Sequence, residues 1–416
     1  MITTINNEHE KNQGRKVLNV PNLRFPEFQG EWEELELSEL LDFKNGLNPK
    51  PDKFGKGVKF ISVMDILNNA VITYDCIKAS VDVMEKELSD FSVEKGDMLF
   101  QRSSETLEDV GRANVYMDDK TAVFGGFVIR GKKKGEYDPQ YFNYLLRSPF
   151  ARKRIIPMGA GAQHFNIGQE GLSKVKLHFA NIEEQKKIGK MLSLLDERIA
   201  TQNKIIDKLQ SLIKGIMAEL QKQGVNQGTW KQETLSNVLT ERNERNTNLY
   251  QVFSVSVSQG VINQVDYLGR SFAAKDTSKY NVVHYGDLVY TKSPTGSFPY
   301  GIVKQSLNLE NVAVSPLYCV YEPKSLAVGA YLHEYFMSEI NTHNYLHPLI
   351  QKGAKNTINI TNQRFLENSV LLPINTNELL LVSKMLRSLN DKLKYQQDIL
   401  QKYQKQKKYL LRQMFI

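Results

Sequence analysis

The sequence predicts an α+β protein in which two tandem α/β modules are joined by two long antiparallel coiled-coil helices, with a pseudo-twofold internal repeat. Three observations lead to this prediction. The chain has 416 residues, which is too long for one ordinary core and suggests two domains. A pattern of glycines, aspartates and apolar residues recurs about 190 residues along the chain. Two stretches carry apolar residues at alternating spacings of three and four, the period of a coiled-coil seam.

The repeat is anchored by a Gly-Asp pair that occurs once in each half. Gly96-Asp97 and Gly286-Asp287 are 190 residues apart. The same offset relates Ser103 to Ser293, Gly111 to Gly301, Phe127 to Leu317, and Tyr141 to Tyr331. The offset then drifts to 193 and 194, where Asn166-Ile167 matches Asn359-Ile360, and Leu192, Leu195 and Asp196 match Leu386, Leu389 and Asn390. Small loop insertions explain the drift, so the chain is a duplicated module.

Each module is predicted to combine a small sheet with a helix. Trp32 and Trp230 stand near the start of the two modules and are expected to anchor their cores. In the first module, residues 59–63, 97–101 and 122–130 have the composition of strands. Asp138-Pro139 is a typical helix start, with a side-chain cap and a proline at the first helical position. It predicts a helix that continues through residues 141–153.

The two periodic stretches are predicted to form long helices that pack on each other as a spacer. A helix of about 40 residues is roughly 60 Å long at about 1.5 Å per residue, which can hold two domains apart. Gln202 and Gln396 interrupt the two seams at equivalent positions. Ordinary bundle helices or a homodimeric coiled coil are the alternatives. The expected helix–helix contacts are Leu192, Leu195, Ile199, Ile206, Leu209 and Ile213 in the first stretch, and Leu386, Leu389, Leu393, Leu400 and Leu410 in the second.

Composition and charge favour an anionic partner. The formal charge is +8 and the pI is about 9.1. Five lysines lie between positions 44 and 59, and Asp52 is the one acid among them. A second basic run, Arg147, Arg152, Lys153 and Arg154, contains no acid. Both groups are candidates for phosphate contacts. With only two cysteines, which form no CxxC pair, the sequence predicts neither a disulfide framework nor a structural zinc site. No apolar run could span a bilayer and no secretory signal is visible, so we expect a cytoplasmic protein.

If the anionic partner is a nucleic acid, loops at equivalent places in the two modules are the expected contacts, because base readout needs side chains with defined hydrogen-bond geometry and nearby cations for phosphates. The alternative for each loop is a plain turn whose polar residues face water. The predicted contacts are Lys50, Lys53, Gln101, Arg102, Ser103, Gln163 and His164 in the first module, and Lys292, Ser293, Thr295, Lys355 and Asn356 in the second.

Motifs for catalysis are missing from the sequence, so we predict a non-enzymatic protein with no bound cofactor or metal. It has no GxxxxGK[ST] loop for ATP and no NPPY-like loop for adenine methylation. Asp52, Asp118 and Lys120 could be read as a loose nuclease triplet, but such triplets are common. His164 lies in a Gly/Ala/Gln loop rather than beside a nucleophile. A nuclease and a stand-alone DNA-binding or structural adaptor are the alternative functions.

Three segments resemble the specificity subunit of type I restriction-modification systems, a resemblance that extends over almost the whole chain. They are PNLRFPEFQGEWEELELSEL at 21–40, GDMLFQRS at 96–103, and NIEEQKKIGKMLSLLDERIATQNKIIDKLQ at 181–210. The resemblance implies that each module is a target recognition domain that reads one half of a bipartite DNA site, while the helices set the spacer. It divides the chain into a flexible tail (1–20), target recognition domain 1 (21–180), a central spacer helix (181–224), target recognition domain 2 (225–374) and a C-terminal spacer helix (375–416).

The same resemblance implies the partners of the chain. These are double-stranded DNA, two methyltransferase subunits and, in the full complex, restriction subunits; S-adenosylmethionine, ATP and Mg²⁺ are expected on those partner subunits. The sequence departs from the family pattern at His178-Phe179-Ala180, where a proline-rich linker is usual. It departs again at Thr376-Asn377-Glu378-Leu379, which replaces the EEQ block in the second copy. These departures lead us to expect a less certain contact with the second methyltransferase subunit.

Overall fold

The computed structural model describes residues 3–4, 18–352 and 358–416, which divide into two compact units. Unit 1 contains the residues up to Asn203 together with Ile399–Ile416, and unit 2 contains Lys204–Asp398. Each unit therefore holds one module and a part of each long helix. The fold is mixed α+β, as predicted.

The elements of the first module lie in unit 1. Its helices are α1 (Leu37–Leu40), α2 (Val63–Asn68), α3 (Glu85–Phe91), α4 (Pro139–Arg147), α5 (Pro149–Ile155) and α6 (Gln169–Ser173). Its strands are β1 (Thr3–Thr4), β2 (Leu23–Arg24), β3 (Glu33–Glu36), β4 (Leu41–Asn45), β5 (Phe54–Ile61), β6 (Ser80–Val81), β7 (Ser92–Val93), β8 (Met98–Gln101), β9 (Ser103–Ser104), β10 (Ala113–Val115), β11 (Ala122–Phe124), β12 (Val128–Lys133), β13 (Phe165–Asn166) and β14 (Lys176–Phe179).

The elements of the second module lie in unit 2. Its helices are α8 (Gln264–Leu268), α9 (Leu326–Tyr335), α10 (Glu339–Leu346) and α11 (Asn362–Glu367). Its strands are β15 (Trp230–Thr234), β16 (Leu239–Glu241), β17 (Phe253–Ser256), β18 (Gly260–Asn263), β19 (Asn281–Val283), β20 (Leu288–Tyr290), β21 (Val303–Gln305), β22 (Val312–Val314), β23 (Cys319–Pro323), β24 (Gln351–Lys352), β25 (Ile358–Asn359) and β26 (Ser369–Pro373).

The two units share one sheet order, which confirms the internal repeat at the level of topology. The main sheet of unit 1 runs β10-β8-β12-β4, and that of unit 2 runs β21-β20-β23-β16. The strand pair β11–β7 has its equivalent in β22–β19, and β14–β3 has its equivalent in β26–β15. In both units two short helices follow the sheet, α4 and α5 in one and α9 and α10 in the other.

The Gly-Asp pair of the repeat forms a turn at the start of a central strand. Gly96 and Gly286 have φ values of 95° and 93°, a left-handed conformation that favours glycine. Asp97 accepts a hydrogen bond from the backbone N–H of Glu94 at 3.0 Å, and Asp287 accepts one from that of His284 at 2.8 Å. Both carboxylates are buried. The strongest sequence anchor of the repeat is therefore a structural device and not a DNA contact.

Two predicted elements are each divided in the structure. The strand predicted over residues 122–130 is two strands, β11 and β12, in different sheets; Gly125 and Gly126 make the turn between them at a place where a Cβ atom would meet neighbouring atoms. The helix predicted over residues 141–153 is divided into α4 and α5 at Ser148. Pro149 lacks the N–H that a continuous helix would need, and the Ser148 hydroxyl instead caps α5 through Ala151 N at 3.2 Å.

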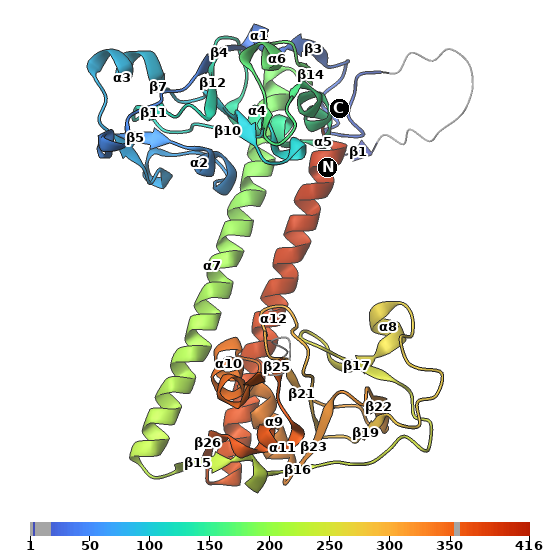
Figure 1. Ribbon diagram of the computed structural model, residues 1–416. Coiled ribbons are helices and arrows are strands. Elements are labelled where there is room, and N and C mark those ends of the chain that lie inside the picture. The colour runs from blue at the N-terminus through green and yellow to red at the C-terminus, as the bar shows by residue number, and fades with distance from the viewer. Residues whose placement is uncertain (1–2, 5–17, 353–357) are drawn as a thin grey trace, which may run out of the picture. The chain divides into compact units, whose positions relative to one another are not determined.

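The two predicted long helices form as uninterrupted elements, α7 (Ile182–Asn226) and α12 (Thr376–Gln413) (Figure 1). In unit 1 the start of α7 packs against the end of α12, and Leu192, Leu195 and Leu410 share one core. In unit 2 the end of α7 packs against the start of α12, and Met217 and Leu386 share one core. Because the start of each helix packs with the end of the other, the pair runs antiparallel. Each of the eleven predicted contact residues is buried or half-buried.

Both tryptophans anchor the cores as predicted. The exposed fraction is 3% for Trp32 and 4% for Trp230. Each indole makes the same edge-on contact with an equivalent tyrosine: the centroids of Trp32 and Tyr141 are 6.1 Å apart, and those of Trp230 and Tyr331 are also 6.1 Å apart. Such aromatic pairs add about 0.5–1.5 kcal/mol beyond burial. The duplication therefore preserves the centre of each core.

A histidine in unit 2 is expected to make that unit sensitive to acid. The ring of His333 accepts a hydrogen bond from Gln305 N at 3.0 Å, and burial lowers its pKa to about 3. The pKa of His333 is lower in the folded protein than in the unfolded chain. The stability that depends on its neutral ring is therefore complete above pH 6.5 and is lost as the pH falls toward 3. We expect the free energy of unfolding to fall by on the order of 2 kcal/mol between pH 7 and 5.

The control for this prediction is His333→Asn, which introduces the residue found at the equivalent position of unit 1, Asn143. Urea unfolding at pH 7 and pH 5 should show a smaller loss of stability for this variant than for the natural chain. Equal losses in the two proteins would contradict the assignment to His333.

Candidate nucleic-acid interface

In unit 1, the structure brings together two loops that were predicted separately to contact DNA. Strand β9 follows β8 directly and pairs with β13, with Ser103 opposite Asn166. The Ser103 hydroxyl also donates a hydrogen bond to the Asn166 side chain. Gln163 and His164 lie in the turn just before β13 and are exposed. Gly161 makes this turn with a φ of 143°, where a Cβ atom would overlap the carbonyl oxygen of His164.

Arg102 is the side chain best placed to read a base in this pair of loops. Its backbone N–H donates to Phe127 O and its carbonyl accepts from Ile167 N, each at 2.9 Å, so the main chain is fixed on both sides. The guanidinium makes one long hydrogen bond, 3.3 Å to Gly126 O. Among the described residues no carboxylate pairs with it. A fixed backbone with most guanidinium donors available suits bidentate recognition of guanine.

Gln101 differs from its predicted role. Its side chain is 5% exposed and its amide nitrogen donates to Ser103 O at 2.9 Å. The side chain therefore supports the turn that carries Arg102 and Ser103 and does not offer its amide to solvent.

Lys50 and Lys53 are sequence neighbours of Pro49 and Phe54, which line a cavity of about 420 Å³ in the same module. Asn48, Pro49, Ser103 and Phe127 are among the residues that line it. Both lysines are exposed, but Lys53 pairs with Asp82 at 3.4 Å. Hydrogen bonds from Lys56 and Lys53 lower the pKa of the Asp82 carboxyl. The lysine-rich segment is thus partly neutralised by an acid that is distant in the sequence.

The arginine run in α4 and α5 is also divided in its roles. Arg152 donates to the carbonyl oxygens of Glu108 and Val110 at 2.8 and 2.6 Å, and burial lowers its pKa to about 10. Arg154 pairs with Glu34 at 3.5 Å. Arg152 holds a loop of the module, so the run does not form one continuous phosphate-binding face.

In unit 2, the equivalent loop places the second set of predicted contacts. Lys292, which occupies the position of Arg102, is half-buried and donates to Asn362 Oδ1 at 2.9 Å. Ser293 is exposed, and Thr295 is half-buried in a turn closed by two hydrogen bonds of 3.0 Å with Phe298. Lys355 and Asn356 lie outside the described residues. Unit 2 thus presents a different set of polar groups on an equivalent strand.

The EEQ block of the first copy makes buried hydrogen bonds within unit 1. Glu184 is fully buried; it accepts two hydrogen bonds from Arg24, at 2.8 and 2.7 Å, and one from the Trp32 indole at 3.3 Å. Gln185 is buried too and joins Asp138 N to Ala180 O. In the second copy Glu378 accepts a hydrogen bond from the Trp230 indole at 2.6 Å. The replaced block therefore keeps the hydrogen bond between its glutamate and the indole of the equivalent tryptophan.

The geometry offers no support for the nuclease alternative. The Asp118 carboxylate accepts hydrogen bonds from the backbone N–H groups of Tyr74 and Lys120, which closes a turn and lowers its pKa. Within the described ranges, no group of three metal-ligating side chains could hold an ion. In the same part of the chain, no helix has the length and apolar character needed to cross a membrane.

Comparison with known proteins agrees with this architecture. Residues 29–211 match the family model described as the type I restriction modification DNA specificity domain. A putative type I restriction enzyme MjaX specificity subunit from Methanocaldococcus jannaschii is 28% identical over 215 residues, covering 50% of this chain and 50% of the relative. The EcoKI specificity subunit of Escherichia coli is 25% identical over 136 residues, covering 32% of this chain and 28% of the relative. The chain thus spans at most about half the length of these two curated relatives.

A solved structure shares the fold over nearly the whole length. The crystal structure of a type I restriction-modification S subunit from M. genitalium superimposes with a TM-score of 0.62. It covers 95% of this chain and 99% of the other, at 14% sequence identity. At this level of identity the likeness concerns the fold, which here includes both modules and both long helices.

Proposed function

This chain belongs to the family of type I restriction-modification specificity subunits, and from that premise we propose that each of its modules reads one half of a bipartite DNA site. Residues 21–180 and 225–374 act as the two target recognition domains. The long helices α7 and α12 set the unspecified gap between the half-sites. The chain itself is the non-catalytic specificity component of the enzyme.

The observation that carries this proposal is a shared scaffold with different side chains at equivalent loops. Both modules have the same order of strands in the main sheet. At the end of the central strand, Arg102 and Ser103 in one module stand where Lys292 and Ser293 stand in the other. A conserved backbone with changed hydrogen-bonding groups is what two different half-sites require, since base edges are distinguished by donor and acceptor pattern.

Partner subunits are proposed to supply the chemistry. We infer that methyltransferase subunits, carrying S-adenosylmethionine, dock on the chain and that restriction subunits with ATP and Mg²⁺ join the full complex. The outer faces of the long helices support docking, because several large apolar residues there are exposed. These are Leu194, Ile205 and Leu212 in α7, and Leu381, Tyr395 and Tyr409 in α12. Exposed apolar groups of this size are common at protein interfaces.

Selection from a random duplex library tests the proposal. The chain, purified in complex with a methyltransferase subunit, should enrich duplexes with two short fixed blocks at one constant separation. Binding should weaken steeply with salt, as expected for a protein that neutralises several phosphates. Enrichment of a single undivided block would contradict the two-module reading. Salt-insensitive binding without sequence enrichment would favour a structural adaptor instead.

A further inference from the structure

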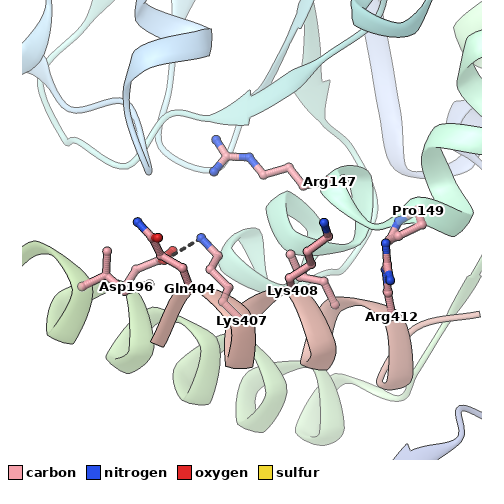
Figure 2. Close-up of a pocket in the computed structure, with 9 residues that line it drawn as sticks. Arg147, Pro149, Asp196, Gln404, Lys407, Lys408 and Arg412 are labelled. Carbon is pink, nitrogen blue, oxygen red and sulfur yellow. Dashed lines mark hydrogen bonds and ion pairs between the residues drawn. The ribbon is translucent and has the colours of Figure 1, made fainter. Parts of the chain in front are cut away.

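Unit 1 contains a basic cleft of about 490 Å³ that lies outside the predicted base-reading loops (Figure 2). It is lined by residues from the α4–α5 junction, the first half of α7 and the last turns of α12. Four of these residues are cations, Arg147, Lys407, Lys408 and Arg412, and one is a carboxylate, Asp196. Figure 2 shows Arg147 on one side of the cleft and the three cations of α12 on the other.

The carboxylate in the cleft neutralises only one of the four cations. Lys407 donates to Asp196 at 2.5 Å, and Asp196 also accepts a hydrogen bond from the Tyr144 hydroxyl at 2.7 Å. Arg147 is held by two backbone carbonyls, Ala113 O at 3.4 Å and Asn69 O at 3.3 Å. In the described part of the chain, no acidic side chain lies within 4.0 Å of Arg147, Lys408 or Arg412. The cleft therefore carries an uncompensated positive charge.

The second copy of the repeat lacks this charge. The residues equivalent to Arg147, Lys407 and Arg412 are Met337, Ile213 and Ala218, and Asp196 corresponds to Asn390. Ile213 packs against the apolar core of unit 2. Only Lys408 keeps a cation, at Lys214. The four cation positions of the cleft thus hold one cation in unit 2, where the ammonium group of Lys304 lies beside Met337 instead.

Interaction with the end of α12 explains a part of the charge but not its arrangement. Cations in the last turn of a helix stabilise its dipole, and Lys408 and Arg412 lie near that end. Arg147, however, belongs to another helix and lies on the opposite side of the cleft, where its guanidinium is held by Ala113 O and Asn69 O. Cations that converge from separate elements are typical of an anion-binding site. Lysine and arginine together suit phosphate, which both can bind.

We propose that this cleft binds phosphate groups of the DNA backbone, independently of base sequence and in unit 1 only. The inference rests on the proposed function, because that function brings a polyanion to the chain. Phosphate contacts of this kind position a protein on DNA without specifying bases. The proposal thus gives α12 and the α4–α5 junction a direct role in the affinity for DNA, in addition to their structural role.

The test compares the double variant Lys408→Gln/Arg412→Gln with the natural chain, both in complex with a methyltransferase subunit. Both side chains are exposed, and Lys407 and Asp196 keep their ion pair, so the fold is preserved. Lys214→Gln is the matched control, because Lys214 is the equivalent of Lys408 in unit 2. The affinity for a selected duplex and for an unrelated duplex is measured from roughly 50 to 200 mM salt. Inorganic pyrophosphate is titrated separately by calorimetry.

We expect the slope of log affinity against log salt to become shallower by roughly 1–2 in the double variant. The loss of affinity should be the same on both duplexes, and Lys214→Gln should leave the slope unchanged. An unchanged slope with intact DNA binding would overturn the inference while leaving the proposed function standing. In that case, pyrophosphate binding lost in the variant would indicate a free phosphate ligand, and weaker association with the methyltransferase subunit would indicate an acidic protein partner. No DNA binding by the natural complex would overturn the proposed function itself.

Discussion

Replacing Glu184 with alanine is expected to lower the free energy of unfolding of unit 1 by about 3–5 kcal/mol. The carboxylate is fully buried, and the Arg24 side chain that it pairs with is 7% exposed. Removing the carboxylate would leave the guanidinium charge buried without a counter-charge, although Arg24 NH1 would keep its bond to Gly30 O at 2.6 Å. The Trp32 indole N–H would also lose its acceptor. The cost comes from desolvated groups left without partners and exceeds the net value of the intact pair.

Urea unfolding followed by tryptophan fluorescence can measure this change, since the chain has two tryptophans, one in each unit. In a Trp230→Phe background the signal reports on Trp32 and hence on unit 1. Glu378→Ala in a Trp32→Phe background is the matched control, because Trp230 is then retained and reports on unit 2. Glu378 accepts the Trp230 indole hydrogen bond, and no arginine among the described residues pairs with it, so its loss should cost only about 1–2 kcal/mol. Equal effects of the two replacements would show that the buried ion pair is unimportant.

Arg102→Ala is expected to reduce affinity for one half-site by about 10- to 100-fold, which corresponds to the loss of one good bidentate base contact of about 1–3 kcal/mol. The backbone at Arg102 is fixed by hydrogen bonds to Phe127 and Ile167, so removal of the side chain should leave the loop intact. The loss should appear as relaxed preference at one base pair of the half-site read by the first module. Titrations with single-base variants of the selected duplex measure this change.

Lys292→Ala provides the reciprocal control, because Lys292 occupies the equivalent position in the second module. It should weaken preference in the other half-site and leave the first unchanged. Lys292 is partly engaged with Asn362, so its effect is expected to be smaller than that of Arg102. Equal losses on every duplex for Arg102→Ala would identify a phosphate contact, and base readout by this residue would then be wrong.

Sequence patterns predicted the features that depend on period and repetition. The alternation of apolar residues located α7 and α12, and the Gly-Asp pairs located the central strand of each sheet, because both patterns reflect local backbone geometry. The tryptophan anchors followed from burial preference. The division of residues 141–153 could have been predicted as well, since Ser148-Pro149 is itself a helix start.

Features that depend on contacts between distant residues could not be predicted from local patterns. The lysines near residue 53 looked unpaired because Asp82, their partner, is distant in the sequence and follows β6. Gln101 looked available although the fold buries it. Nothing local indicates that Glu184 and Gln185 contact Arg24, Trp32 and Asp138. The basic cleft was missed because Arg147 and the cations of α12 are far apart in the sequence.

Mapping methylated adenines in a host genome is the most direct test of the central claim. The chain would be co-expressed with a methyltransferase subunit, and modified positions would be read by single-molecule sequencing. The account predicts a bipartite motif with a fixed gap, in which exchange of residues 230–374 for those of a relative changes one half only. An undivided motif, a change in both halves, or no new methylation despite a stable complex would contradict it.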